Sequence, residues 1–499
     1  MADTKPDCQE IELKLSGTAA SLASAFRSLA GDRPHARRLV STYYDTGDAR
    51  LWRKGFTLRL RRLDQGCELT LKQETRDPLA RGEWTSRVSG PPVDLALLPA
   101  TAPRGEIGTI LPGEFRECVV TDIRRAARRL EIDGAAVEVA LDIGRICAGA
   151  RAIDVAELEF ELIDGPVAAM LGLVRALTRR RRLTLDARSK AERGMALAQA
   201  GTPAPARAAR AKLKRSDTAA AALARILKVS AAQVVGNLAA AQDGRDPEGV
   251  HQFRVALRRL RSALALFPGR LSPAARALDG EAARALAILG PARDFDVFIT
   301  ETLPPVMAAG PLHEGLARLA KRAEQRREEA YGAVRDLVGD PRLTRFLLDL
   351  MIAAEDATPL VGAGGRRMGQ LAGMLLGKRH AKVLGAGRDF TRLGHRERHR
   401  VRVGVKKLRY ACDFFRTLYP GRAARAYLDR LSRLQDQLGH LNDATMIGEI
   451  TRELAGDDEQ ANLAAALATG WYGHRLQAEE PRMIAAWQRF AGERPFWNR

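Results

Sequence analysis

The chain has 499 residues, 46 % of them hydrophobic, which is enough for two or three domains that each have a core. Its net charge is +21, and residues 201–499 hold 49 Lys and Arg against 32 Asp and Glu, so we expect a polyanionic partner. The five cysteines form no C-x-x-C pair, which argues against a disulfide framework or a zinc site and favours a reducing cytoplasm. The polar N-terminus predicts no secretory signal, and no apolar run predicts a membrane span.

The first 200 residues repeat a period of two, which is typical of β-strands. In EIELK, the side chains of Glu10, Glu12 and Lys14 share one face, and apolar side chains share the other. For one such segment alone, a surface strand with a solvated polar face is an adequate interpretation. The same alternation recurs in FTLRLRR at 56–62, ELTLKQ at 68–73, RGEWT at 81–85, VEVALD at 137–142 and AELEFEL at 156–162.

Six strands with one charged and one apolar face cannot all be solvated edges, because their apolar faces need partners. We therefore expect the strands to close into a barrel, with the apolar side outward under helices and loops and the charged side inward. The helices predicted to cover the barrel span 18–30, 122–130 and 166–182. An interior of this kind is stable only if its charges pair with one another or bind ions and a ligand.

A charged interior of this composition suits the cleavage of phosphate anhydrides. Arginine holds phosphate oxygens through a bidentate fork, and lysine holds them as a point charge. Rows of carboxylates hold hard divalent cations, which can neutralise phosphates and activate water. No GxxxxGK[ST] loop occurs, so the site is not a P-loop. The side chains concerned are Arg59, Arg61 and Lys72 for phosphate, and Glu10, Glu12, Glu157, Glu159 and Glu161 for cations.

The ordered set of motifs resembles the CYTH family, the triphosphate tunnel metalloenzymes, over about residues 8–200. The resemblance implies an eight-stranded antiparallel β-barrel with flanking helices, which cleaves triphosphate substrates with Mg²⁺ or Mn²⁺. It rests on E-x-E-x-K at 10–14, R-x-R at 59–61, the lysine of the next strand and E-x-E-x-E at 157–161, with YYDT (43–46), TDIRR (121–125), ALDIG (140–144) and RSKAERG (188–194).

The same resemblance assigns roles to individual residues. Arg124 or Arg128 could take the place of Arg125, and Glu83 would help to line the tunnel. The implied metal ligands are Glu10, Glu12, Glu159 and Glu161, with Asp142 and Glu157 as further ligands or neighbours of ligands. The implied triphosphate ligands are Lys14, Arg59, Arg61, Lys72, Arg125 and Lys190, and the residues predicted to be catalytic are Glu10, Glu12, Lys14, Arg59, Arg61 and Lys72.

The remainder of the chain is predicted to be helical. Residues 201–216 are rich in Ala, Pro and basic residues, which is typical of a linker. From 217 to 499, Ala, Leu and Arg follow a helical period and predict an all-α domain. Its motifs recur: HQFRVALRRLRS at 251–262 returns as HRVRVGVKKLRY at 399–410, and LGPARD at 289–294 returns as LGHLND at 438–443. The spacings of 148 and 149 residues predict two pseudo-symmetric repeats, about 217–360 and 361–499.

Each repeated helix carries basic residues at i, i+3, i+7 and i+10, which form a stripe along one face. If the repeats bring the two stripes together, they form a cationic channel for a linear polyanion. Aromatic residues make up only 5 % of the chain and do not interleave with the basic runs, so a nucleic acid is not the expected partner. The histidines could equally pack or cap helices, and Asp294 and Asp443 could orient the arginines. The stripes are His251, Arg254, Arg258 and Arg261, and His399, Arg402, Lys406 and Arg409.

This half resembles the CHAD domain, a two-fold helical bundle that is associated with polyphosphate binding. Together the two resemblances imply an α+β protein of the inorganic triphosphatase fusion type: a metal-dependent enzyme that hydrolyses tripolyphosphate to pyrophosphate and phosphate, with a helical domain that binds inorganic polyphosphate. We expect it in the cytoplasm and at polyphosphate granules, without a membrane partner. The alternatives are a hydrolase of thiamine or nucleoside triphosphate, an adenylate cyclase, or a non-catalytic scaffold on polyphosphate granules.

Overall fold

The computed structural model describes residues 9–31, 36–75, 77–199, 201–267, 272–309, 313–362 and 365–498, except the side chains at 313 and 440–445. The chain forms two compact units. The barrel unit comprises residues up to 206 with 231–249 and 338–355, and the helical unit comprises 207–230, 250–337 and 356–499. The division of the chain into two domains by a linker at 201–216 stays a prediction. Within this segment, residues 201–214 form neither helix nor strand.

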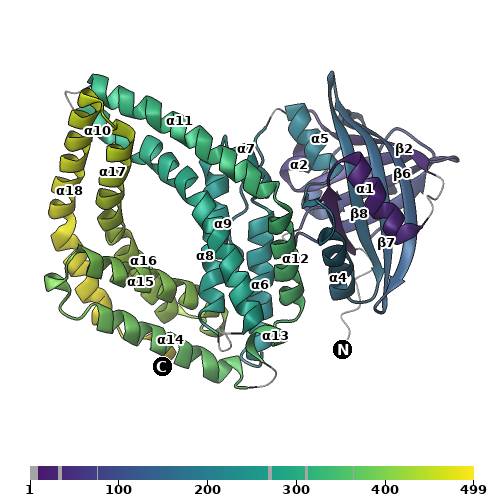
Figure 1. The fold of residues 1–499 in the computed structure, drawn as a ribbon. Coiled ribbons are helices and arrows are strands. Elements are labelled where there is room, and N and C mark those ends of the chain that lie inside the picture. The colour runs from purple at the N-terminus through teal and green to yellow at the C-terminus, as the bar shows by residue number, and fades with distance from the viewer. Residues whose placement is uncertain are drawn as a thin grey trace. The chain divides into compact units, whose positions relative to one another are not determined.

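Eight antiparallel strands form a closed barrel in the first unit (Figure 1). Their spatial order is β5-β4-β3-β2-β6-β7-β8-β1, and pairing between β1 and β5 closes the sheet. The two-residue strand β9 (Thr184–Leu185) adds to β1 outside the closed circuit. The predicted eight-stranded barrel is therefore confirmed. The strands are β1 (Gln9–Ser16), β2 (Arg37–Thr46), β3 (Phe56–Arg62), β4 (Cys67–Gln73), β5 (Ala80–Val88), β6 (Phe115–Ile132), β7 (Ala135–Ala148) and β8 (Arg151–Asp164).

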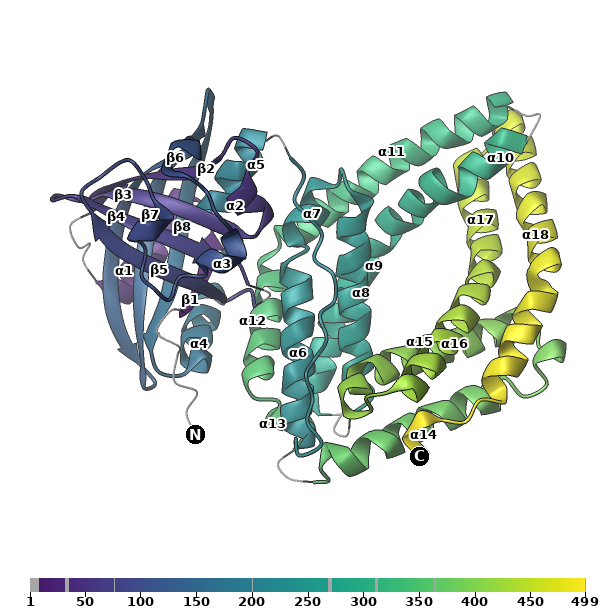
Figure 2. The same cartoon turned by 180° about the vertical axis from the view of Figure 1, so that it is seen from behind.

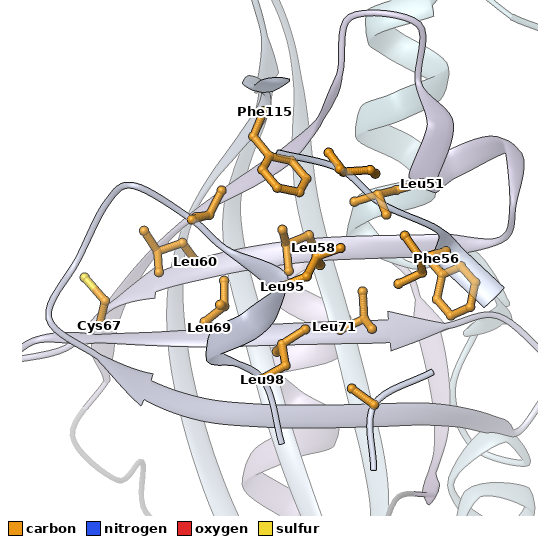
Figure 3. Packing of buried hydrophobic residues seen from close by; sticks show 14 residues of the cluster. Leu51, Phe56, Leu58, Leu60, Cys67, Leu69, Leu71, Leu95, Leu98 and Phe115 are labelled. Atoms are coloured by element: carbon orange, nitrogen blue, oxygen red, sulfur yellow. The ribbon is translucent and has the colours of Figure 1, made fainter. Parts of the chain in front are cut away.

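The alternating sequence places apolar side chains outside the barrel, where helices and loops cover them. On β3 and β4, Leu58, Leu69 and Leu71 are fully buried beneath the segment that contains Leu95 and Leu98 (Figure 3). Burying a leucine side chain contributes about 1.5–3 kcal/mol, so this outer core holds the two strands in one register. That register in turn aims the alternate side chains of each strand into the barrel.

The barrel unit contains several helices, and two of the three predicted ones are present. The first begins after Thr18, whose Oγ1 accepts a hydrogen bond from Ser21 N at 3.2 Å. The predicted helix 122–130 is wrong, because those residues lie within β6: all of them pair with β7, and residues 122–125 also pair with β2. Arg and Ala favour a helix locally, but these ladders outweigh that preference. The helices are α1 (Ala19–Ala30), α2 (Arg50–Arg53), α3 (Arg104–Ile107), α4 (Val167–Thr178), α5 (Lys190–Gln199), α7 (Leu238–Asp243) and α12 (Pro341–Glu355), with 3₁₀ turns at Leu95–Leu97 and Pro112–Glu114.

Two glycines from the quoted motifs stand where a side chain has no room. A Cβ on Gly144 of β7 would lie 2.0 Å from the carbonyl oxygen of Asp122 on β6. A Cβ on Gly194 of α5 would lie 2.3 Å from Val119 Cγ1. The close approach of α5 to β6 holds the N-terminus of α5, and with it Lys190, at the barrel.

The helical unit consists almost entirely of helices (Figure 2). In both views α8 and α9 lie on one side of this unit, and α17 and α18 lie on the opposite side. Its helices are α8 (Pro247–Leu264), α9 (Pro273–Val297), α10 (Leu303–Ala309), α11 (His313–Val338), α13 (Thr358–Val361), α14 (Met368–Ala386), α15 (His395–Phe415), α16 (Arg422–Gln437), α17 (Gly439–Ala455) and α18 (Glu459–Ala491). A π-helical segment at Phe298–Thr302 and 3₁₀ turns at Phe390–Arg392, Arg416–Leu418 and Phe496–Asn498 complete it, and α6 (Ala219–Val235) belongs to both units.

The repeated motifs occupy related but unequal places. The first H-x-x-R-V motif lies in α8 and the second in α15. LGPARD lies inside the continuous helix α9, whereas LGHLND lies at the junction of α16 and α17. By length and composition alone, the stretch Ala219–Asp243 could cross a membrane, although 61 % of its most apolar window is buried inside the structure, as in a core helix.

Candidate functional site

The barrel encloses a cavity of about 190 Å³ to which all eight strands contribute side chains. Every residue predicted to bind metal or triphosphate lines this cavity, except Glu157, which lies fully buried beside it. The structure therefore brings together side chains that are up to 180 residues apart in the sequence. The predicted residues that line it are Glu10, Glu12, Lys14, Arg59, Arg61, Lys72, Glu83, Arg125, Asp142, Glu159, Glu161 and Lys190.

Three arginines, Arg59, Arg61 and Arg125, form a basic pole in the cavity. Burial, together with the neighbouring positive charges of Arg59 and Arg125, lowers the pKa of Arg61 to about 10. Arg59 donates a hydrogen bond from Nη2 to Thr70 Oγ1 at 3.1 Å, but its buried Nε has no hydrogen-bond partner in the described part of the chain. Crowded positive charge and an unused buried donor both favour an anion as occupant.

Four glutamates form an acidic pole in the same cavity: Glu10, Glu83, Glu138 and Glu161. Burial and the charge of Glu10 raise the pKa of Glu161 to about 7, and Glu83 and Glu138 contribute to this rise. Lys72 lies between two of these carboxylates, with Nζ 2.6 Å from Glu10 and 3.2 Å from Glu83. Burial alone would raise the pKa of Glu10, but Lys72 and Lys14 outweigh it and lower that pKa to about 2.

A second group of carboxylates is already neutralised by basic side chains. Asp142, Glu157 and Glu159 each offer an oxygen within 4.8 Å of the others, and Lys190 Nζ contacts all three, at 2.6 Å from Asp142 and 2.9 Å from Glu159. Arg125 pairs with Asp142 and Glu159. Although burial disfavours its charged form, these three acids raise the pKa of Lys190. This buried network therefore fixes the positions of Lys190 and Arg125 at the cavity.

Glu12 is also paired in the structure. It accepts from Lys14 Nζ at 2.5 Å and forms an ion pair with Arg81, which is itself almost fully buried. Arg81 Nε in turn lies 3.1 Å from Glu74, another cavity residue whose pKa burial and the charge of Glu192 raise to about 7. Glu12 thus differs from Glu10 and Glu161, because two basic side chains, Lys14 and Arg81, both pair with its Oε1.

The helical unit contains a larger cavity of about 990 Å³, to which α8, α9 and α15 contribute basic side chains. Arg254 illustrates its character, because burial and the charge of Arg258 lower its pKa to about 10. Both predicted stripes line this cavity except at one position: Arg409 does not, and its Nε donates to Gln435 Oε1 at 2.7 Å. The lining residues from the stripes are His251, Arg254, Arg258, Arg261, His399, Arg402 and Lys406, joined by Arg276, Arg293 and Lys407.

Comparison with known proteins agrees with both halves of this description. The CYTH domain model matches residues 8–195 and the CHAD domain model matches residues 225–452. Residues 8–195 thus form a CYTH domain, and residues 225–452 form a CHAD domain. The crystal structure of the CHAD domain from the plant Ricinus communis is similar to 58 % of this chain and 98 % of its own, at 29 % identity and a TM-score of 0.52.

The CYTH domain also has similar proteins of described activity. An inorganic triphosphatase of Haemophilus influenzae is 32 % identical over 166 residues, which are 32 % of this chain and 46 % of that protein. This chain therefore spans about half the length of the curated relative that it matches. A protein from Hippeastrum with a dominant triphosphatase activity has 19 % identity and a TM-score of 0.28, over 35 % of this chain and 89 % of its own.

The carboxylates of the CYTH domain fit a hard divalent cation, because all their donor atoms are oxygens. The acidic pole suits this role better than the buried network, whose acids are already paired with Lys190 and Arg125. Of the predicted metal ligands, Glu10 and Glu161 belong to that pole. Among the described residues, Glu161 forms no ion pair within 4 Å, so its oxygens are available for a cation.

Sequence reasoning missed several residues of both domains. In the CYTH domain, Glu68, Arg81 and Glu138 lie on the inward face of strands that had been quoted, so the alternation itself could have placed them. Arg193 lies one helical turn after Lys190 and pairs with Glu157. In the CHAD domain, the basic residues missed are the cavity-lining Arg276, Arg293 and Lys407. Asp294, which could orient the arginines, also lines this cavity, whereas the side chain of Asp443 lies outside the described residues.

Proposed function

We propose that the protein is a metal-dependent inorganic triphosphatase, which hydrolyses tripolyphosphate to pyrophosphate and phosphate. The single observation that carries this proposal is the division of one enclosed cavity into a pole of three arginines and a pole of four glutamates. A phosphate anhydride with a bound divalent cation matches this division, because its phosphates are negative like the ligands of arginine and its cation is positive like the ligands of glutamate. The similarity of the CYTH domain to an inorganic triphosphatase supports a triphosphatase-type hydrolase.

The chain's own residues supply binding and orientation in this reaction. Arg59 and Arg61 would hold phosphate oxygens through their guanidinium forks, and Lys190 and Arg125 are held in place for the same task by the buried acids. Glu10 and Glu161 would hold Mg²⁺ or Mn²⁺, which would supply charge neutralisation at the phosphates and activation of water. The enclosed barrel limits bulk water, so these charges interact more strongly than they would in solution.

The lining of the cavity supports a substrate without an organic ring. Its apolar lining residues are Leu39, Tyr43, Ile123, Ala140 and Ala191, among more than a dozen charged or hydroxyl side chains. Tyr43 is the single aromatic residue among the lining residues that the structure describes, so no pair of rings is present to sandwich a base or thiamine.

For the CHAD domain, we propose that the basic cavity binds linear inorganic polyphosphate. Ten basic side chains line it and two carboxylates, Asp279 and Asp294, accompany them. A chain of phosphates without bases suits a wide, strongly cationic cavity, because no stacking surface is needed. The association with polyphosphate granules and the cytoplasmic location belong to this proposal.

The test is phosphate release by the purified full-length protein from tripolyphosphate, ATP, thiamine triphosphate and long-chain polyphosphate, each with and without Mg²⁺ or Mn²⁺. The expected result is metal-dependent turnover of tripolyphosphate well above that of the other three. If ATP or thiamine triphosphate is turned over faster than tripolyphosphate, that compound replaces tripolyphosphate as the assigned substrate. No turnover of any substrate, combined with tight retention of long-chain polyphosphate, would favour the non-catalytic scaffold.

A further inference from the structure

Glu68 is a carboxylate located among the arginines of the basic pole. Its Oε1 lies 3.3 Å from Arg59 Nη2 and 3.9 Å from Arg61 Nη1. It is directly opposite Arg61 in the β3–β4 ladder, so all three side chains lie on the inner face of the barrel and line the same cavity. The pole that would receive phosphates therefore already contains a negative charge contributed by the protein.

The position of Glu68 along its strand places this charge near one end of the barrel. Strand β4 begins at Cys67, directly after the turn that joins it to β3, so Glu68 is its second residue. The next inward side chains along β4 are Thr70 and Lys72. From this end inward, the order along β4 is a carboxylate, a hydroxyl and an ammonium group. A phosphate chain that extends from Lys72 past Arg59 would meet the carboxylate at the level of Arg61, and could not extend further without passing it.

We propose that Glu68 is a specificity-determining residue, which limits the occupant of the cavity to a chain of three phosphates. This inference rests on the proposed function. Phosphates bound by Arg59 and Arg61 gain from the two guanidinium groups, but a further phosphoryl group at this end would lie against a fixed like charge. Glu68 thus selects against longer chains, whereas the arginines alone would bind any phosphate chain.

The experiment compares full-length wild-type protein with Glu68→Gln, which keeps the shape and the hydrogen-bond acceptor but removes the charge. Glu131→Gln is the matched control, because Glu131 is an exposed glutamate that pairs with an arginine outside the cavity. The rates measured are kcat/KM for tripolyphosphate and for tetrapolyphosphate with Mg²⁺. We expect the ratio of tetraphosphate to triphosphate kcat/KM to rise about tenfold in Glu68→Gln, and to stay unchanged in the control. A ratio within about twofold of wild type would overturn the inference.

Calorimetric titration with the same two phosphates separates this inference from the proposed function. A wild-type protein that prefers tripolyphosphate in binding but hydrolyses neither phosphate contradicts the proposed function. If Glu68→Gln then removes the binding preference, the inference is supported. A wild-type protein that binds neither phosphate overturns both. If Glu68→Gln melts at a lower temperature than the control, Glu68→Asp provides the test, because it keeps the charge: the preference must persist, and its loss would overturn the inference.

Discussion

Lys72 on β4 and Glu10 on β1 contact each other inside the barrel, with Nζ 2.6 Å from Oε2, although β5 lies between their strands. Lys72 is a predicted phosphate ligand and Glu10 a predicted metal ligand. Without substrate, each therefore satisfies the charge of the other. In the proposed function, phosphate bound at Lys72 would release Glu10 for a cation, and a cation bound at Glu10 would release Lys72 for phosphate.

This ion pair predicts positive coupling between tripolyphosphate and the divalent cation. We expect Mg²⁺ to tighten tripolyphosphate binding at least about fivefold, which is at the lower end of common coupling energies. The measurement is calorimetric titration at matched free ligand concentrations. In Lys72→Met, Mg²⁺ should tighten tripolyphosphate binding by a smaller factor, because the lysine no longer competes with the cation for Glu10. An equal factor in wild type and Lys72→Met would contradict this mechanism.

Removing Arg59 should abolish hydrolysis without unfolding the protein. Loss of a preorganised charged donor in an enclosed site commonly costs about 100-fold or more in kcat, and we expect at least this for Arg59→Ala. Glu10→Ala should behave similarly through loss of the cation. The control is Arg145→Ala, since Arg145 forms an exposed ion pair with Asp154 outside the cavity. Wild-type turnover in Arg59→Ala or Glu10→Ala, with native circular dichroism, would disprove the site assignment.

Lys190 should matter for stability as well as for substrate. It contacts three acids, of which Asp142 and Glu157 are fully buried, so Lys190→Met removes a positive charge from among them and leaves arginines as the partners of these two. Breaking a buried pair in this way typically costs about 3–5 kcal/mol in the free energy of unfolding. Urea unfolding would measure the loss, with the exposed Arg129→Met as the control. A loss below about 1 kcal/mol, as expected of an exposed ion pair, would show that the acids do not depend on Lys190.

The affinity of the CHAD domain for polyphosphate should rise as the pH falls below 7. Burial and the charges of Arg402, His395 and Lys406 lower the pKa of His399 below its usual value, so His399 is neutral at pH 7. A bound polyanion favours the protonated form. Affinity is therefore gained as the pH falls through the pKa of the free protein, and lost as the pH rises.

The measurement for this prediction is polyphosphate affinity of the full-length protein between pH 5.5 and 8. His399→Gln should reduce the pH dependence and leave the part contributed by His251, which lines the same cavity. His474→Gln is the matched control, because His474 is an exposed histidine of α18 that does not line the cavity. An unchanged pH profile in His399→Gln would exclude this histidine as a source of the pH dependence of polyphosphate affinity.

The sequence predicted the barrel because its strands obey one simple rule, the alternation of charged and apolar residues. The same rule made β6 hard to recognise, because DIRRAARRL lacks alternation and its Arg and Ala residues favour a helix. Its strand conformation comes from ladders with β2 and β7, whose partners are distant in sequence. Local preference could not supply that information.

For the site, the sequence indicated which residues face inward but not how their charges pair. Glu10, Glu12, Glu159 and Glu161 look equivalent as alternating glutamates. The structure separates them, because Arg81 and Lys14 hold Glu12, Lys190 and Arg125 hold Glu159, and Glu161 remains beside other carboxylates. Such pairing depends on distances across the barrel, which register along one strand does not reveal. Likewise, helical periodicity placed Arg409 in the basic stripe, but a neighbour on α16 binds it instead.

The pairing of β1 with β8 has a consequence for the order of events during synthesis. Strand β1 of the barrel finds its partners only when Ala80–Val88 and then Arg151–Asp164 have been made. Until then its polar backbone and one apolar face stay uncovered, while β2 to β5 and β6 to β8 can form hairpins with near neighbours. Closure of the ring therefore requires β8, and the pairing of β1 with β8 completes it. A chain shortened before residue 151 should retain exposed strand edges and associate with itself.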